Sequence, residues 1–371
     1  NDAGKTSLLE AMAAFCASSG KDLKNAFSEP WMGRELVLHG SDDSSIQFAG
    51  EWTASHNRAT ESAASALEYG FRVNFPHEGR ACKTEGERCA FAGETREIPN
   101  IGGYDTTAVK WWLEHDHVPG EWQGAFERIS GVLKPSHKYA LDAKLMAVPA
   151  AFDIARHFKL DPDGFGLATL LDDILGHDAE LFLRLRSAFC SFFPQFKSIG
   201  IKTESALKRQ YVVTGLHHSG QADGKGIYFE TRTGETVRAQ QASDGAILFL
   251  GLLALAHLPQ PPNLLLLEEP ENGIYPKRLG EVITLLKQMV HRTEGVPFPQ
   301  IIMSTHSPYV LSFFEPEEVT FLSREPGRPD GPVRARPLRE APNIKERLAG
   351  GEFYLGELWY NLSEEDLFGE P

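Results

Sequence analysis

The sequence predicts an α/β fold built on a parallel core sheet, with an antiparallel β-region and a helical insertion lobe. Two short, continuous apolar segments, Leu264–Leu267 and Ile301–Ser304, flank a helical segment at Leu279–Arg292. This is the pattern of a parallel sheet that is covered on both faces. Short alternating runs separated by Gly, Ser and Asp fill residues 35–101 and indicate antiparallel strands. Residues 106–196 follow a helical period instead.

These patterns divide the chain into four parts. We predict an N-terminal part of the α/β domain at 1–105, a helical lobe at 106–196, a C-terminal part of the α/β domain at 197–345 and a tail at 346–371. Individual segments sharpen the prediction. Helices are expected at Thr6–Ala17, Ala179–Phe193 and Ala246–Leu258, and short strands with Gly-rich turns are expected at Tyr211–Arg238.

Composition excludes several classes of protein. The 42% hydrophobic content is enough for a substantial core. The formal charge of −14 argues against non-specific coating of nucleic acid. No apolar run approaches the ~20 residues of a membrane span, so no membrane partner is expected. Four cysteines do not suggest a disulfide framework, so a reducing, cytoplasmic setting is expected.

The first residues carry most of a phosphate-binding P-loop, also called a Walker A motif. Asn1-Asp2-Ala3-Gly4-Lys5-Thr6-Ser7 matches the second half of G-x-x-x-x-G-K-[ST], so the first glycine of the motif is expected before Asn1. In such a loop, backbone N–H groups and the helix N-terminus hold the phosphates. Lys5 should reach the β- and γ-phosphates of a nucleotide, and the Thr6 hydroxyl should ligate Mg²⁺.

Two adjacent acids follow four leucines, in the manner of a Walker B motif. The segment Leu264-Leu-Leu-Leu-Glu268-Glu269-Pro270 predicts a buried strand that delivers rigid carboxylates to the sheet edge where the P-loop lies. We expect Glu268 to hold Mg²⁺ through water and Glu269 to polarise the attacking water. Burial of both charges without a cation would be costly, which argues for a functional site.

Two further segments complete the predicted site. The strand Ile301–Ser304 ends in Thr305-His306-Ser307, and His306 is placed to report the γ-phosphate. Ser243-Asp244-Gly245 precedes the helix at 246–258, with Ser243 as its expected N-cap, and offers a second phosphate clamp.

Together these motifs resemble the ABC-type head of the SMC-like ATPases, and in particular the stand-alone AAA-family ATPases related to the RecF and OLD groups. The resemblance implies a P-loop NTPase fold with ATP and Mg²⁺ as cofactors. No Asp-x-Asp cluster follows His306, so the resemblance does not extend to the TOPRIM nuclease of OLD relatives. Three features depart from the family pattern. Glu268 stands where Asp is common, Tyr275 stands where many relatives have His, and Gln47 is only a candidate for the expected metal-contacting glutamine.

The resemblance also implies a homodimer with two ATP molecules between its subunits. Each ATP would lie on the P-loop of one subunit and face Ser243-Asp244-Gly245 of the other. The aromatic stretch 352–360 could dock a separate effector or pack on its own domain. Lys197, Lys202, Lys208 and Arg209 form a basic cluster that could be a solvated strand edge or a surface for DNA or RNA.

The leading functional hypothesis is an ATP-hydrolysing dimeric switch that controls a nuclease-type effector, in anti-phage defence or DNA repair. Defence is favoured by analogy with the effector-paired subgroup. Two alternatives stay open at this stage. One is a scaffold that binds ATP without hydrolysing it, and the other is the ATPase subunit of a transporter. The sequence does not identify the effector, the trigger or the turnover rate.

Overall fold

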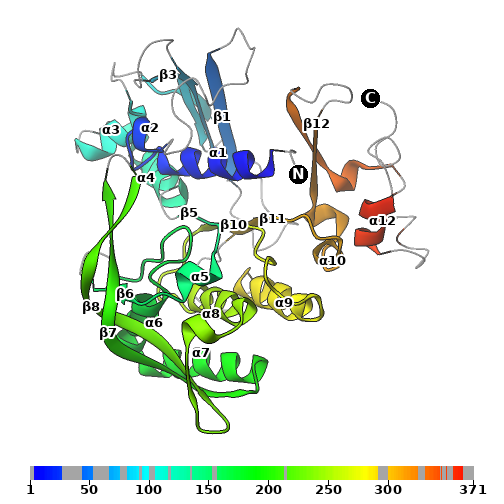
Figure 1. Ribbon diagram of the computed structural model, residues 1–371. Coiled ribbons are helices and arrows are strands. Elements are labelled where there is room, and N and C mark those ends of the chain that lie inside the picture. The colour runs from blue at the N-terminus through cyan, green and yellow to red at the C-terminus, as the bar shows by residue number, and fades with distance from the viewer. Residues whose placement is uncertain are drawn as a thin grey trace. The chain divides into compact units, whose positions relative to one another are not determined.

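A computed structural model describes the protein at residues 4–26, 44–52, 67–75, 82–91, 94–99, 105–115, 118–133, 136–152, 157–212, 215–290, 300–324, 331–342, 344, 348 and 354–361. Two compact units divide the chain (Figure 1). Unit 1 comprises residues 1–6, 137–326 and 333–371, and unit 2 comprises residues 7–136 and 327–332. These bounds differ from the four predicted parts, and each unit is described by itself.

A parallel pair of strands forms the centre of unit 1. Strand β10 (Leu264–Glu268) pairs in parallel with β11 (Gln300–Ser304), and β5 (Ser136–Tyr139) is hydrogen-bonded on the other side of β10 (Figure 1). Helix α9 (Leu279–Val290) lies between β10 and β11 in the sequence. The predicted α/β fold class with a parallel sheet is confirmed. Strand β5 lies within residues 106–196, where the sequence predicts only helices, so this prediction is corrected. The strand could not be recognised in the sequence because its four residues include no apolar run.

Helix α8 (Asp244–Ala256) is the most buried helix of the core. All its side chains from Ala246 to Ala256 are buried, as expected for a helix that is apolar all round. Three helices from the preceding segment contribute residues to the same core: α5 (Ala143–Met146), α6 (Leu167–His177) and α7 (Ala179–Phe192). Of the helices within the predicted lobe at 106–196, α5, α6 and α7 lie in unit 1, whereas α3 (Ala108–Glu114) and α4 (Gly120–Leu133) lie in unit 2.

A long hairpin replaces the short strands predicted for 211–238. Strand β7 (Phe196–Val212) pairs antiparallel with β8 (Gly215–Thr231), which also pairs with β9 (Thr236–Arg238). Strand β6 (Ala150–Ala151) pairs with both long strands. Several glycines that suggest turns in the sequence lie inside this ladder. At Gly224, a Cβ would come within 2.2 Å of the carbonyl oxygen of Ala150, so glycine permits the close approach of β6.

The C-terminal part of unit 1 contains short elements. They are η4 (Ala239–Gln241), η5 (Pro276–Arg278), α10 (Pro308–Leu311), η6 (Pro316–Glu318), β12 (Thr320–Arg324), β13 (Val333–Pro337), η7 (Leu338–Glu340) and α12 (Leu355–Asn361). Leu355 and Leu358 of α12 are buried in a small apolar cluster with Leu338 and Ile344. Two leucines of the stretch 352–360 therefore pack on their own unit, whereas Tyr354 is 70% exposed.

Unit 2 is built on an antiparallel sheet in the order β1-β2-β3-β4. Its elements are α1 (Lys5–Ala17, whose first two residues belong to unit 1), α2 (Leu23–Ala26), β1 (Ser45–Trp52), β2 (Leu67–Asn74), β3 (Lys83–Phe91), β4 (Glu94–Glu97), α3 (Ala108–Glu114) and α4 (Gly120–Leu133). Phe15 of α1 stacks on Phe48, Trp52 and Tyr69 of the sheet, with ring centroids 5.7, 6.0 and 5.9 Å away. The predicted antiparallel β-region is confirmed, whereas its first expected strand, at 35–39, lies outside the described residues.

Among the described residues, no helix is both long enough and apolar enough to cross a membrane.

Candidate functional site

The P-loop enters helix α1 through a glycine that no other residue could replace easily. Gly4 has a φ of +71°, in the left-handed region that favours glycine, and a Cβ there would come within 2.9 Å of Val333 Cγ2. Helix α1 begins at the next residue, Lys5, so the first turn leaves its backbone N–H groups available to an anion. Asn1, Asp2 and Ala3 lie outside the described residues, and Ser7 is the third residue of the helix.

The acids and the polar triplet meet at one edge of the sheet. Glu268, the last residue of β10, is the register partner of Ser304, the last residue of β11. The strands are parallel, so the residues that follow each of them leave the sheet on the same side. The backbone N–H of Glu269 donates to the carbonyl oxygen of Ser304 at 3.1 Å, which ties the second acid to the end of the neighbouring strand.

Glu268 is held by residues from two other elements. The Thr6 hydroxyl, in the first turn of α1, donates to Oε1 of Glu268. The ammonium of Lys138, on β5, lies 3.4 Å from Oε2 of the same carboxylate, and the Lys138 and Glu268 side chains are only 19% and 21% exposed. The structure thus joins Thr6 and Glu268, the two residues predicted to share a metal ion. It adds Lys138, which sequence reasoning missed.

Glu269 is held by two different partners. Oε1 lies 3.0 Å from Nε2 of His306, and Oε2 accepts a hydrogen bond from the Asn272 side-chain amide at 2.7 Å. The backbone of Glu269 has a φ of +43°, which is unusual for a residue with a side chain and is a form of strain found at functional sites. The predicted catalytic pair, Glu269 and His306, is therefore in direct contact.

Burial and neighbouring charges set the protonation of these groups. Burial lowers the pKa of Lys5, and the negative charge of Glu269 partly opposes that change. Burial also lowers the pKa of His306 below its ordinary value of 6.5, and the positive charge of Lys5 adds to the effect. Burial and Lys5 thus favour the neutral imidazole, while the negative charge of Glu269 opposes that change in the pKa of His306.

A third glutamate lies behind the first two. Glu271 is only 9% exposed, and its Oε1 accepts a hydrogen bond from the Thr305 hydroxyl. Its Oε2 is buried and has no hydrogen-bond partner among the described residues. Burial raises the pKa of Glu271, while the bond from Thr305 opposes the rise. Glu271 thus links the loop after β10 to the residue before His306.

The segment Ser243-Asp244-Gly245 lies at the start of α8, as predicted. Ser243 occupies the N-cap position, but its side chain makes no capping hydrogen bond. A Cβ on Gly245 would come within 3.1 Å of the carbonyl oxygen of Gly273, so the start of α8 packs on the loop after β10. Within the described part of the chain, no hydrogen bond or ion pair joins this segment to Lys5 or Thr6. Its predicted role toward a second subunit remains a prediction.

The basic cluster of the sequence lies on β7. Lys197 pairs with Glu230 at 2.9 Å, and the Lys202 ammonium lies 4.6 Å from the centre of the Tyr228 ring. These cations are engaged by the neighbouring strand. Gln47, the candidate metal-contacting glutamine, is an exposed residue of β1 in unit 2.

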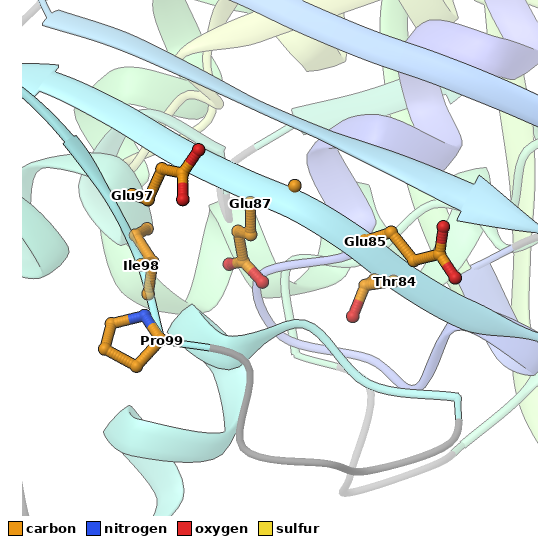
Figure 2. Close-up of a pocket in the computed structure, with 7 residues that line it drawn as sticks. Thr84, Glu85, Glu87, Glu97, Ile98 and Pro99 are labelled. Atoms are coloured by element: carbon orange, nitrogen blue, oxygen red, sulfur yellow. The ribbon is translucent and has the colours of Figure 1, made fainter.

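Unit 2 contains a cavity of about 380 Å³, and none of the predicted site residues lines it. Figure 2 shows its lining, which includes the carboxylates of Glu85, Glu87 and Glu97. Acidic walls oppose the binding of phosphate groups. Within the described ranges, no cluster of three potential metal-ligating residues occurs here or elsewhere.

Comparison with known proteins finds a family match over part of the chain. Residues 131–312 match the family model described as "AAA domain, putative AbiEii toxin, Type IV TA system". The matched segment includes Lys138, Glu268, Glu269 and His306, and it begins after the P-loop. Residues 131–312 are therefore similar to an AAA-domain family, which agrees with the AAA-family part of the predicted resemblance.

Two solved structures of Smc heads are similar in outline. One is an Smc head bound to the C-terminal winged-helix domain of ScpA, with 13% identity, coverage of 94% of this chain and 90% of that chain, and a TM-score of 0.49. The other is an Smc head domain with an extended coiled coil bound to the C-terminal domain of ScpA, derived from Pyrococcus furiosus. It shows 10% identity, coverage of 94% and 91%, and a TM-score of 0.45. A search of curated proteins gave no match.

Proposed function

We propose that the protein binds and hydrolyses ATP and works as a dimeric switch that controls a separate effector. The observation that carries this proposal is the convergence of Thr6 from the P-loop helix on Glu268 at the end of β10. Beside it lies Glu269, in contact with His306. A metal-shell pair and an acid–histidine pair thus share one sheet edge, as phosphoryl transfer to water requires.

The residues present fit ATP and Mg²⁺. Residues Asn1–Ser7 would hold the phosphates, with Gly4 allowing close approach of the backbone and Lys5 supplying charge. Thr6 and Glu268 would hold Mg²⁺, Glu268 through water, because hydroxyl and carboxylate oxygens are the ligands that this ion prefers. When bound, Mg²⁺ neutralises charge on the phosphate oxygens.

Glu269 and His306 would act on the attacking water. A carboxylate at the strand end can accept the proton of that water, and Asn272 and His306 fix the orientation of the carboxylate. In the neutral form that burial favours, an Nε2–H of His306 would donate to Glu269 or to a phosphate oxygen without adding a charge. In this proposal Glu269 is the base and His306 is the sensor of the γ-phosphate.

The dimeric and regulatory parts of the proposal rest on the family resemblance. Ser243, Asp244 and Gly245 of one subunit would clamp the nucleotide of the other, with the start of α8 directed at the phosphates. Closure of the dimer with ATP and its opening after hydrolysis would be transmitted to a nuclease-type effector. Anti-phage defence or DNA repair, with DNA or RNA as trigger, is the setting that this class suggests.

ATP turnover by Glu269→Gln tests the proposal. We expect kcat to fall about 100-fold or more, because the water loses its base, while KM changes by less than about threefold. The trapped variant should be a dimer with ATP and Mg²⁺ in size-exclusion chromatography with light scattering. Glu281→Gln, the same change on an exposed position of α9, is the matched control.

Two results would contradict the proposal. Equal turnover by Glu269→Gln and wild type would remove Glu269 from the reaction. Tight ATP binding by a wild type that has no turnover would favour a non-hydrolysing scaffold.

A further inference from the structure

Strand β5 brings a lysine to the metal-shell carboxylate. Lys138 lies on the strand that is hydrogen-bonded to β10, and its ammonium is 3.4 Å from Oε2 of Glu268. Both side chains are about four-fifths buried. An ion pair that is largely withdrawn from water is screened much less than a surface pair, so it holds its partners in place more firmly.

Glu268 needs such support more than an aspartate would. A glutamate has one more methylene group than an aspartate, and the torsion at its carboxylate is soft. If only Oε1 were held, by Thr6, the carboxylate could turn about that single contact. Lys138 takes the second oxygen, so both oxygens have a fixed direction.

We propose that Lys138 is a positioning residue that orients Glu268 for Mg²⁺ and compensates for the extra length of glutamate at this position. The inference rests on the proposed function, because it concerns the same ATP site. It assigns Lys138 no direct contact with the nucleotide. Groups that orient metal-shell ligands typically contribute 10- to 100-fold to metal affinity.

The first experiment measures the Mg²⁺ requirement of Lys138→Met, a change that keeps the length of the side chain and removes its charge. We expect the Mg²⁺ concentration for half-maximal ATP turnover to rise about tenfold. In calorimetry, binding of ATP with Mg²⁺ should weaken by a similar factor, whereas ATP binding in EDTA should stay within about twofold of wild type. Lys138→Arg should recover most of the Mg²⁺ affinity, since it restores a cation.

A double-mutant cycle tests whether Lys138 acts through Glu268. Glu268→Asp removes one methylene group. The carboxylate then lies farther from Lys138 and has one torsion fewer for Lys138 to restrain. In this background, Lys138→Met should change the Mg²⁺ requirement by less than about twofold. The same tenfold shift in both backgrounds would overturn the proposal, because Lys138 would then act on the phosphates directly.

Controls separate this inference from the proposed function. Lys144→Met, at an exposed position of α5, is the matched charge removal and should behave as wild type. Lys5→Ala should abolish ATP binding. If wild type binds ATP without hydrolysing it, the proposed hydrolytic function is wrong. Calorimetry with and without Mg²⁺ still tests the role of Lys138 in that case. If wild type turns over ATP and Lys138→Met has an unchanged Mg²⁺ requirement, the inference alone fails.

Discussion

Each unit contains a buried glutamate, and the two carboxylates differ in how completely they are hydrogen-bonded. Glu87 on β3 is 5% exposed, and Glu271 after β10 is 9% exposed. Burial raises the pKa of both carboxyls. Glu87 accepts the backbone N–H groups of Ala108 at 2.6 Å and Val109 at 3.1 Å, and the Tyr69 hydroxyl at 2.8 Å. Both of its oxygens therefore have partners.

Glu271 differs in how its two oxygens are bonded. Its Oε1 accepts the Thr305 hydroxyl, whereas its buried Oε2 has no hydrogen-bond partner in the part of the chain that the structure describes. A buried polar atom without a partner costs about 1–3 kcal/mol. Glu87 thus stabilises the first turn of α3. The unpartnered oxygen of Glu271 instead lowers the free energy of unfolding of unit 1, near Glu269 and His306. The comparison is between a carboxylate with both oxygens bonded and one whose second oxygen is buried without a partner.

The largest expected effect comes from Glu87→Ala. The change leaves two N–H groups of α3 and the Tyr69 hydroxyl without their acceptor, so unit 2 should lose about 3 kcal/mol of stability. Hydrogen exchange at the α3 amides is the appropriate measurement, because a chain with two units need not unfold in one step.

Glu85→Ala is the matched control on the same strand. Glu85 is exposed, and its ion pair with Lys83, at 3.9 Å, should contribute little. Equal protection of α3 in the two variants would break the comparison, since Glu87 would then not stabilise the helix.

A smaller effect, on activity as well as stability, is expected from Thr305→Val. The valine removes the hydroxyl that donates to Glu271 and that accepts the backbone N–H of Ser307 at 2.9 Å. These two hydrogen bonds fix the backbone on both sides of His306. Their loss should misplace His306, so kcat should fall about tenfold. The free energy of unfolding should drop by about 2 kcal/mol.

ATP turnover and thermal denaturation measure these two quantities. Thr284→Val on α9 is the control, because its exposed hydroxyl donates only to the Gly280 carbonyl of its own helix. Thr305→Ser keeps the donor and should retain activity. A Thr305→Val enzyme with normal kcat would show that the Glu271–Thr305 contact does not position His306.

The sequence was sufficient for elements whose pattern is local. Strand β10 was predicted at 264–267 and ends at Glu268, because four leucines before two acids and a proline have few other interpretations. Helix α7 was predicted at 179–193 and spans Ala179–Phe192, where apolar residues recur at helical spacing. The roles predicted for Glu269 and His306 remain untested, although the two side chains are in contact.

Features that depend on distant pairing could not be predicted. Lys138 lies in a four-residue strand without an apolar run, and its importance arises only because β5 is next to β10 in the sheet. The φ of Glu269 likewise follows from the bond between its backbone and Ser304, and no local signal marks it. The sequence predicts short strands where the hairpin β7–β8 lies, because the glycines of this segment resemble turn residues.

The smallest expected effect, and the one that sharpens the comparison most, is a gain of stability from Glu271→Gln. The folded pKa of Glu271 lies above its ordinary value of 4.5, so the folded state holds the proton more tightly than the unfolded state. Below pH 4.5 the carboxyl is protonated in both states and costs nothing. As pH rises through the folded pKa, ionisation destabilises the fold progressively.

Glutamine avoids this cost, so Glu271→Gln should be about 1 kcal/mol more stable than wild type at pH 7, with the difference vanishing toward pH 4.5. Thermal denaturation across this range measures the difference, with Glu281→Gln as the exposed control. A loss of stability at pH 7 would instead show that the fold uses the Glu271 carboxylate as a hydrogen-bond acceptor, as it uses Glu87.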